Sequence, residues 1–285
     1  MSRIAYVNGR YVPHRDASVH IEDRGYQFAD GVYEVCEVHS GDIIDLDPHL
    51  ERLERSLREL RMAAPMSRAC LPGILQEVIG RNRVRDGIVY VQVTRGVAPR
   101  DHAFPKSGIS SLVITAKSMD RRSGDAKRGR GARVVTVPET RWARVDIKSI
   151  GLLPNVIARQ TAIEAGADEA WFVDGEGHVL EGAATNAWIV TGSTIVTRSA
   201  ERGILRGITR ATVMKAATSM QMTVEERAFT VAEAQSADEA FMTAASTLVM
   251  PVIAIDGTAV GTGGPGPVTS RLRDAFHDVA ERTAA

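Results

Sequence analysis

The chain has 285 residues, of which 44% are apolar and 25% are charged. A chain of this length and composition can bury a sizeable core in two domains or one large one, and disorder is excluded as the default state. Thirty-five basic residues balance 35 acidic ones, which removes the usual electrostatic argument for binding nucleic acid or an anionic membrane.

The first third of the chain predicts antiparallel strands and two helices. Asn8-Gly9 separates two short β-rich runs, the pattern of a tight hairpin turn. A helix is expected to open at Asp47-Pro48, because the leucines after it recur at helical spacing. The expected elements are hairpins over 4–12 and 31–46 (turn at 40–42), the helix carrying Leu50, Leu53, Leu57 and Leu60, a helix over 71–83, and strands within 87–96 and 110–118.

Residues 119–131 interrupt this pattern, being polar, charged and glycine-containing, and we interpret them as an interdomain linker. The second part then predicts a strand at 132–139, a helix at 153–166, hairpins at 169–182 and 186–197, a helix at 209–220, two strands within 238–257 and a helix at 268–282. The whole is expected to be α+β, with mainly antiparallel strands and flanking helices in domains 1–118 and 132–285.

Lys148 is the strongest candidate for covalent chemistry. The chain has 30 arginines and only five lysines, so a lysine kept in a small and apolar setting suggests chemistry that a guanidinium cannot perform. A buried ε-amine can lose its proton and attack a carbonyl to form a Schiff base, whereas arginine stays protonated. The simpler interpretation is a strand lysine that points to solvent.

Three further segments carry weaker signals. Glu181 precedes a run of small residues, which lets a carboxylate reach a ligand lying against the backbone. Gly207 directly precedes a predicted helix, where Ile208 and Thr209 offer N–H groups and a hydroxyl to an anion. Residues 244–247 form a second small-residue turn. A solvated hairpin-end glutamate and an ordinary helix start are the simpler interpretations.

Arg100 and His102 lie on a loop stiffened by prolines and could clamp a carboxylate, or form a solvated pair. The glycine-rich residues 261–267 do not predict a phosphate loop, because they lack the Lys-Ser/Thr ending and two prolines remove donors. The seven histidines show no metal-binding spacing, so we expect no metal.

Several segments occur together in the order found in one family. They are RGYQFADGVYEV (24–35), PHLERL (48–53), VTRGVAPRDHAFP (93–105), RWARVDIKSIGLLPNV (141–156), LEGAATN (180–186) and ILRGITR (204–210). The chain resembles the class IV aminotransferases, pyridoxal-phosphate enzymes that share the fold of D-amino acid and branched-chain aminotransferases. The RxHxF form at Arg100 to Phe104 resembles the D-amino acid branch.

The resemblance implies a cofactor between the two domains, with the Schiff-base lysine in the second. It implies that Lys148 forms the Schiff base with pyridoxal phosphate and moves the proton, and that Glu181 pairs with the pyridine nitrogen. The implied phosphate residues are Arg52, Ile208 and Thr209 with the turn Ala244-Ala245, and the implied carboxylate residues are Tyr33, Arg100 and His102. Arg141 resembles a supporting residue near the lysine.

One departure affects the cofactor. Alanines stand at 244 and 245, where the D-amino acid branch usually carries hydroxyl groups, and Ala183 and Ala184 likewise replace serines. Fewer side-chain donors would contact the cofactor, so we expect weaker cofactor affinity than in a hydroxyl-rich relative.

The resemblance implies ping-pong transamination of D-amino acids, such as D-alanine and D-glutamate, with 2-oxo acids, in a homodimer. A branched-chain L-aminotransferase, an amine transaminase, an aminodeoxychorismate lyase and a non-catalytic pyridoxal-phosphate binder remain alternatives. With only Cys36 and Cys70 as thiols and no apolar signal segment or membrane span, we expect a soluble cytoplasmic protein with no nucleic-acid or membrane partner.

Overall fold

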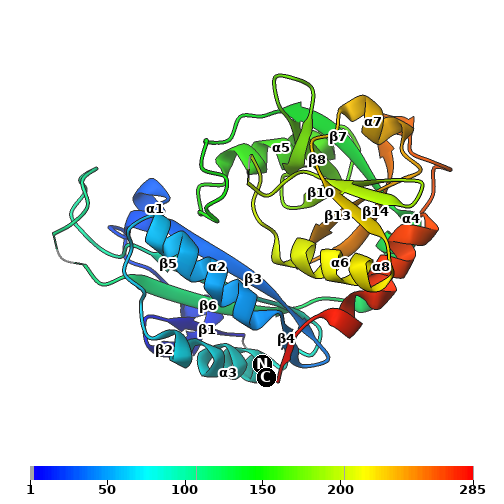
Figure 1. Ribbon diagram of the computed structural model, residues 1–285. Coiled ribbons are helices and arrows are strands. Elements are labelled where there is room, and N and C mark those ends of the chain that lie inside the picture. The colour runs from blue at the N-terminus through cyan, green and yellow to red at the C-terminus, as the bar shows by residue number, and fades with distance from the viewer. Residues whose placement is uncertain (1–2, 107, 202, 285) are drawn as a thin grey trace. The chain divides into compact units, whose positions relative to one another are not determined.

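The computed structural model describes residues 3–106, 108–201 and 203–284 (Figure 1). The chain divides into two compact units. Unit 1 comprises Met1–Asp120, Ile147–Gly151 and Glu281–Ala285, and unit 2 comprises Arg121–Asp146 and Leu152–Ala280.

Among the described residues, unit 1 contains a seven-stranded antiparallel sheet in the order β16-β4-β3-β5-β6-β1-β2. Its strands are β1 (Ile4–Val7), β2 (Arg10–Pro13), β3 (Gly31–His39), β4 (Asp42–Ile44), β5 (Gly87–Thr94), β6 (Ser111–Ser118) and β16 (Arg282–Thr283). The turn between β1 and β2 has φ of 46° at Asn8 and 90° at Gly9, the left-handed pair that a tight hairpin requires.

One face of this sheet is covered by α2 (Leu46–Glu59) and α3 (Leu71–Asn82). Val32, Cys36 and Val38 of β3 alternate into the shared core, and Leu53 of α2 and Leu75 of α3 pack against them. Shorter helices are η1 (His14–Asp16), α1 (Arg24–Phe28) and η2 (Arg68–Cys70). The intervening β3 residues, including Tyr33, are half-buried on the opposite face.

Unit 2 contains a nine-stranded sheet in the part of the chain that the structure describes, with β12-β11-β10-β13-β14-β7-β8-β9 in order and β15 on β14. A further pairing of β9 with β10 closes β10-β13-β14-β7-β8-β9 into a ring. Its strands are β7 (Ala132–Pro138), β8 (Glu169–Val173), β9 (Val179–Gly182), β10 (Asn186–Thr191), β11 (Thr194–Thr197), β12 (Thr223–Glu226), β13 (Glu239–Ala244), β14 (Leu248–Ile255) and β15 (Thr258–Ala259).

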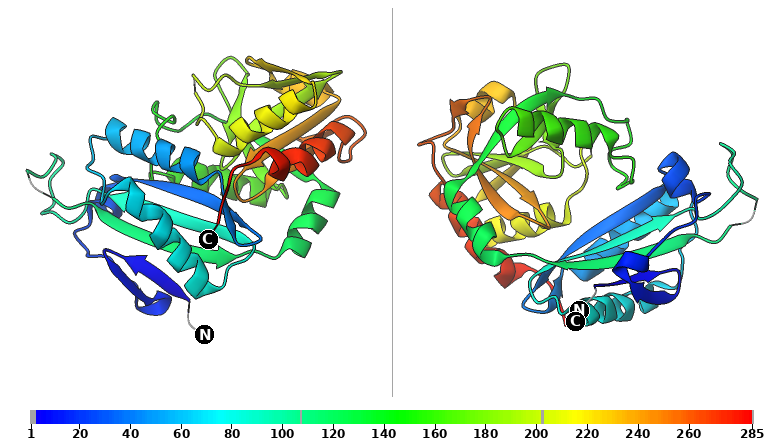
Figure 2. Two further views of the ribbon diagram at one scale, coloured as in Figure 1. Left: turned by 60° about the horizontal axis from the view of Figure 1, so that its bottom comes forward. Right: turned by 180° about the vertical axis from the view of Figure 1, so that it is seen from behind.

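The helices of unit 2 are α4 (Arg121–Arg130), α5 (Leu153–Glu164), α6 (Ile208–Ser219), α7 (Val231–Ser236) and α8 (Pro267–Val279) (Figure 2). Large aromatic side chains fill the interior, among them Trp188 stacked on Phe241 with ring centroids 5.3 Å apart. Three strand pairs are parallel, β7 with β8, β7 with β14 and β11 with β12. The remaining pairs are antiparallel, so the predicted α+β architecture with mainly antiparallel strands is confirmed.

The compact units differ from the predicted domains. Residues 121–130 of the expected linker form helix α4 in unit 2, where Lys127 and Arg130 approach Asp168 at 3.4 and 3.1 Å. The predicted final helix ends at Val279, because the chain becomes extended at Ala280 and continues as β16 beside β4.

The expectation that residues 132–285 carry the lysine in the second domain also needs correction. Ile147–Gly151 belongs to unit 1, because its backbone pairs with β3 and the Ile147 side chain enters the core of unit 1. No helix in the described ranges combines the length and apolarity needed to cross a membrane.

Candidate active site

Lys148 lies on a short extended segment held against the edge of β3. The Tyr33 N–H donates to the Lys148 carbonyl at 3.0 Å, and the Ile150 N–H donates to the Gly31 carbonyl at 3.0 Å. Gly31 is required for this approach, since a Cβ there would lie 2.8 Å from the Ile150 side chain. The segment therefore continues the sheet where β4 has ended, and it fixes the backbone from which the amine projects.

The Lys148 side chain is directed over an aromatic ring. Its Nζ lies 4.2 Å from the centroid of the Tyr33 ring, and the residue is half-buried. The Tyr33 ring stacks on Tyr90 with centroids 5.6 Å apart, and the Tyr90 hydroxyl donates to Gln92 at 2.7 Å. Burial, and to a lesser extent Tyr33, raises the pKa of Tyr90 to about 12. The amine thus lies over a stacked ring pair whose Tyr90 hydroxyl stays protonated at physiological pH.

Arg52 takes part in a buried ion pair on the helix-covered face of the same sheet. Its Nε and Nη2 donate to the two carboxylate oxygens of Glu34 at 2.7 and 2.8 Å, and His49 Nδ1 lies 2.7 Å from Glu34 Oε2. Burial opposes the charged form of Glu34, but Arg52 and His49 outweigh it and lower the pKa to about 2. Burial lowers the pKa of His49 despite this carboxylate, so the group is an ionised pair with a neutral histidine.

Arg100 and His102 are exposed and gather around a different residue from Tyr33. The Arg100 guanidinium lies 4.6 Å from the centroid of the Phe28 ring, and the His102 ring centroid lies 5.4 Å from that of Phe28. The predicted carboxylate clamp therefore falls into two groups within unit 1. Tyr33 is with Lys148, and the loop residues are with Phe28.

Glu181 ends β9 in unit 2 and is 5% exposed. Its carboxylate accepts hydrogen bonds from Arg141 Nη1, from Asn186 Nδ2 at 3.0 Å and from the Leu205 N–H at 3.1 Å. Donors from three separate segments of the chain fix its orientation. A solvated hairpin-end glutamate, the simpler interpretation from sequence, does not describe this residue.

Arg141 supports Glu181 within unit 2. Its guanidinium also binds the Glu139 carboxylate, with Nη2 to Oε2 at 2.6 Å, and it lies 4.3 Å from the centroid of the Phe172 ring. Burial disfavours the charge, but the two carboxylates outweigh that effect and raise the pKa of Arg141. Arg141 is therefore a permanent cation beside Glu181.

The predicted phosphate residues of unit 2 occupy a helix start and a turn. Helix α6 begins at Ile208 with Gly207 as its N-cap, and a Cβ at Gly207 would lie 2.0 Å from Asn186 Oδ1. The first N–H groups of a helix have no intrahelical partners and suit an anion. Thr209 is buried. The turn after Ala244 and Ala245 closes through the Thr247 N–H on the Ala244 carbonyl at 3.1 Å.

A buried hydroxyl in this turn tests whether an anionic group fits. Thr247 Oγ1 is enclosed and has no hydrogen-bond partner among the described residues. An orphaned buried donor is costly unless a ligand or water satisfies it. Together with the helix start, this donor set suits a phosphate.

The chain is similar to one family of known proteins. The family model described as Amino-transferase class IV matches residues 31–255. The chain is 39% identical to a D-alanine aminotransferase of Bacillus licheniformis over 95% of both chains, and 37% identical to one of Staphylococcus haemolyticus over 97% of both.

A solved branched-chain amino acid aminotransferase of T.th. with pyridoxamine 5'-phosphate has a TM-score of 0.92 at 27% identity, covering 98% of this chain and 94% of that one. The chain belongs to the class IV aminotransferase family. The resemblance inferred from the motifs, and the prediction that the chain is an aminotransferase, are confirmed.

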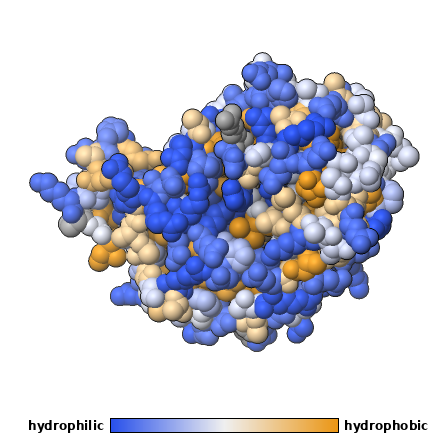
Figure 3. All heavy atoms as spheres, viewed as in Figure 1, coloured by the Kyte–Doolittle hydropathy of each residue, from blue (hydrophilic) through white to orange (hydrophobic). Residues whose placement is uncertain are grey.

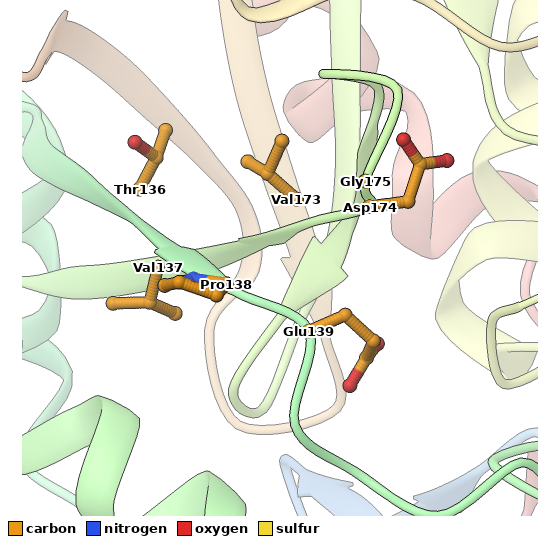
Figure 4. A pocket seen from close by; sticks show the side chains of 7 residues that line it. All are labelled: Thr136, Val137, Pro138, Glu139, Val173, Asp174 and Gly175. Carbon is orange, nitrogen blue, oxygen red and sulfur yellow. The ribbon is translucent and has the colours of Figure 1, made fainter.

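A surface pocket of this class IV aminotransferase contains none of the predicted site residues. It has a volume of about 390 Å³ and is lined by residues of β7, β8 and the following turn, as Figure 4 shows: Thr136, Val137, Pro138, Glu139, Val173, Asp174 and Gly175. Glu139 of this pocket binds Arg141 through its carboxylate. We therefore do not assign the substrate to this pocket.

Sequence reasoning missed Glu34, His49 and Asn186 of the class IV aminotransferase. Glu34 stands in the apolar phase of β3, between Val32 and Cys36, and a carboxylate in that phase signals a buried partner. Asn186 was visible in the LEGAATN segment. No local pattern showed that it would join Glu181 to the start of α6.

Proposed function

We propose that this aminotransferase transfers amino groups between D-amino acids and 2-oxo acids with pyridoxal phosphate as cofactor, by ping-pong kinetics. The observation that carries the proposal is the half-buried amine of Lys148, fixed over Tyr33 by backbone pairing with β3. The D-alanine aminotransferases that share 36–39% of the sequence support the choice of D-amino acids.

Pyridoxal phosphate, when bound, supplies an electron sink for the electrons left on the substrate α-carbon. Lys148 would hold it covalently. Its phosphate would be held by Arg52, by the helix start at Ile208 and Thr209, and by backbone N–H groups of Ala244 and Ala245. Arg52 would then serve two anions, because it also binds Glu34. An arginine has five donors in a fixed fork and can do so.

Lys148 acts as the base that moves a proton on the substrate. Its amine would hold the cofactor only until the amino group of the substrate replaces it there. The freed amine would then take the proton from the α-carbon, and a general base of this kind typically contributes about 10²–10⁴-fold. Glu181 would offer its carboxylate to the ring nitrogen of the cofactor, and its three donors keep that carboxylate oriented.

Tyr33, Arg100 and His102 bind the α-carboxylate of the substrate. Because the lysine works from one fixed face, the position of the carboxylate decides which enantiomer presents its α-hydrogen to the amine. Exchange of the carboxylate and side-chain positions would select the other enantiomer, so these three residues determine the preference for D-amino acids.

Replacement of Lys148 by alanine tests the proposal. We expect the Lys148→Ala protein to lose the visible absorbance of the cofactor and all transamination of D-alanine, while Lys117→Ala, at an exposed position of β6, keeps both. Turnover by Lys148→Ala would refute the assignment of the lysine. A Glu181→Gln protein should retain the cofactor and remove the α-proton more slowly. We expect its reaction rate with D-alanine to fall more than the rate at which its cofactor, supplied in the amino form, reacts with a 2-oxo acid.

A branched-chain L-aminotransferase is the second candidate function, favoured by the TM-score of 0.92 to the solved branched-chain enzyme. Initial rates with D-alanine, D-glutamate, L-leucine and (R)-1-phenylethylamine separate the substrate classes. We expect the D-amino acids to be fastest, and equal or faster turnover of L-leucine would overturn the D-amino acid assignment.

A homodimer is part of the proposal. Apolar side chains of α5 lie exposed on one side of the helix, with Leu153 at 69% and Val156 and Ile157 at 59% exposure. Figure 3 shows apolar residues reaching the surface in small patches among mainly hydrophilic ones. A second copy of the chain is the expected occupant of the α5 face. Arg100 and His102 contact Phe28, whereas Tyr33 contacts Lys148 and Tyr90, and this arrangement suits a loop that serves the partner's lysine.

Mixed dimers test this arrangement. If the loop serves the partner, co-expressed Lys148→Ala and Arg100→Ala chains should regain about a quarter of the wild-type activity, because half of randomly formed dimers are mixed and each has one complete site of two. Each variant alone should stay low, and a mixture that never exceeds their sum would show that the loop serves its own chain.

The two free cysteines, Cys36 and Cys70, support a cytoplasmic location.

A further inference from the structure

The loop that carries Arg100 and His102 is fastened by a buried arginine, Arg24 of α1, which is only 3% exposed. Its Nη1 donates to the Asp101 carbonyl at 2.6 Å, and its Nη2 lies 3.5 Å from the His102 carbonyl. One guanidinium therefore holds the backbone at the two positions that immediately follow Arg100.

Arg24 is itself fixed by the sheet. Its Nε donates to Asp30 Oδ2 at 2.8 Å, and Arg95 binds both oxygens of the same carboxylate at 2.7 and 3.0 Å. Burial raises the pKa of Asp30, but the two arginines outweigh it and the pKa is lowered. The backbone N–H of Arg24 also donates to the Gly96 carbonyl at 2.9 Å. The start of the loop and its middle are thus tied to one residue.

The same helix supplies the ring on which the clamp residues rest. The Phe28 ring has Arg24 and Arg100 at 4.8 and 4.6 Å from its centroid, and His102 packs against it. A guanidinium that lies over an aromatic face is attracted to the ring, and the arginine side chain can still extend towards a ligand. Helix α1 therefore sets both the backbone and the side-chain positions of the loop.

We propose that Arg24 is a positioning residue for substrate-carboxylate recognition, acting through Arg100 and His102. The inference rests on the proposed function, in which those two residues bind the carboxylate. The forked guanidinium donates to Asp30 and to two carbonyls at once. A lysine ammonium donates from a single nitrogen and cannot reach all three acceptors with that geometry. Charge alone should therefore not replace Arg24.

The test compares Arg24→Lys and Arg24→Gln with the wild-type holoenzyme. We expect the KM for D-alanine to rise about 10- to 100-fold in both, because a small misplacement of a binding group has effects of that size, while kcat changes less than about threefold. The rate of reaction of the bound cofactor with hydroxylamine, an amine without a carboxylate, should stay unchanged.

A readout independent of activity follows the loop itself. Amide hydrogen exchange of residues 97–104 should be faster in both variants than in the wild type, with and without cofactor. Arg68→Gln is the matched control, because Arg68 forms ion pairs with Asp47 and Glu54 on another part of unit 1. It should leave the KM, the hydroxylamine rate and the exchange of the loop as they are.

If the Arg24 variants do not fold, Phe28→Leu decides, since it keeps an apolar side chain and removes the ring under Arg100. It should raise the KM for D-alanine with an unchanged hydroxylamine rate. An unchanged KM in folded variants overturns the proposal, as does an equal loss of the hydroxylamine and D-alanine rates. Absence of cofactor absorbance and transamination in the wild type would instead refute the proposed function.

Discussion

Two carboxylates, Glu34 in unit 1 and Glu181 in unit 2, are buried beside an arginine, and they are held in different ways. Glu34 binds Arg52 through both carboxylate oxygens and His49 through one of them. Arg52 and His49 lie three positions apart on a single helix. Glu181 binds Arg141, the side chain of Asn186 and the backbone of Leu205, which come from three segments.

The two arrangements stabilise their carboxylates in different ways. The pair of Glu34 balances one full charge against another inside a core, so each partner depends on the other. Glu34 has one neutral donor besides its arginine, His49 from the same helix, whereas Glu181 has two from separate segments, Asn186 and Leu205, and these fix the direction of its oxygens even when the charge balance changes. Burial of a carboxylate is common to both, and only the second arrangement suits a group that must face a ligand.

Removal of either arginine should have the largest effect on stability, and the loss should be greater for Arg52 than for Arg141. Arg52→Met leaves Glu34 enclosed without its main partner, and we expect the free energy of unfolding to fall by about 3–5 kcal/mol. Arg141→Met should cost about 1.5–3 kcal/mol, because Asn186 and Leu205 remain. Urea denaturation of the cofactor-free proteins measures both.

The double variant Glu34→Gln with Arg52→Met is the control, and it should recover part of the loss since no buried charge is left. Equal losses for the two arginine variants would mean that the neutral donors around Glu181 contribute nothing.

The second largest effect is expected from acid, which protonates Glu34 and removes its charge pair with Arg52. Its pKa falls from an ordinary 4.5 to about 2 on folding, so its contribution is complete above about pH 4.5 and is lost as the pH drops towards 2. The loss amounts to about 3 kcal/mol. The pKa of His49, lowered mainly by burial, adds a separate loss that begins nearer neutral pH.

The pH dependence of the unfolding free energy measures this effect. Glu34→Gln should flatten the curve below about pH 4.5 relative to the wild type. Parallel curves for the two proteins would show that Glu34 does not titrate with the stated pKa.

The smallest expected effect concerns neutral donors at the turn of Ala244 and Ala245. We expect Ala244→Ser with Ala245→Thr to tighten pyridoxal phosphate binding by about 5- to 10-fold, as one added hydrogen bond is worth about 1 kcal/mol. Titration of the cofactor-free proteins measures it, with pyridoxal, which has no phosphate, as the control ligand. Retention of cofactor by the wild type through long dialysis would contradict the weak affinity that motivates the change.

Local signals predicted the elements they govern. Asn8-Gly9 adopts the left-handed pair expected of a hairpin turn, and the leucine stripe of α2 is buried as its spacing predicts. The charge and glycines of residues 119–131 predict a linker, because they disfavour a helix. Residues 121–130 nevertheless form helix α4, which ion pairs with the distant Asp168 help to hold.

Long-range contacts set the candidate site, and these were beyond sequence reasoning. Arg24 meets Asp101 across 77 positions of the chain, and Lys148 meets Ser56 across 92. Motifs identified the residue types, but neither spacing nor periodicity encodes which strand edge a segment will join. The docking of Ile147–Gly151 on β3 and the donors around Glu181 therefore required the structure.

The interrupted course of unit 1 has a consequence for how the protein is made. Its sheet receives one piece from Ile147–Gly151 and an edge strand from Arg282–Thr283. While the ribosome is still synthesising the middle of the chain, the edge of β3 that binds Ile147–Gly151 has no backbone partner. The partner of β4, strand β16, is synthesised last. We therefore expect that residues 1–120 do not fold on their own. Expression of this fragment should yield an aggregation-prone product, because the strand edges that Ile147–Gly151 and β16 cover in the full chain stay uncovered.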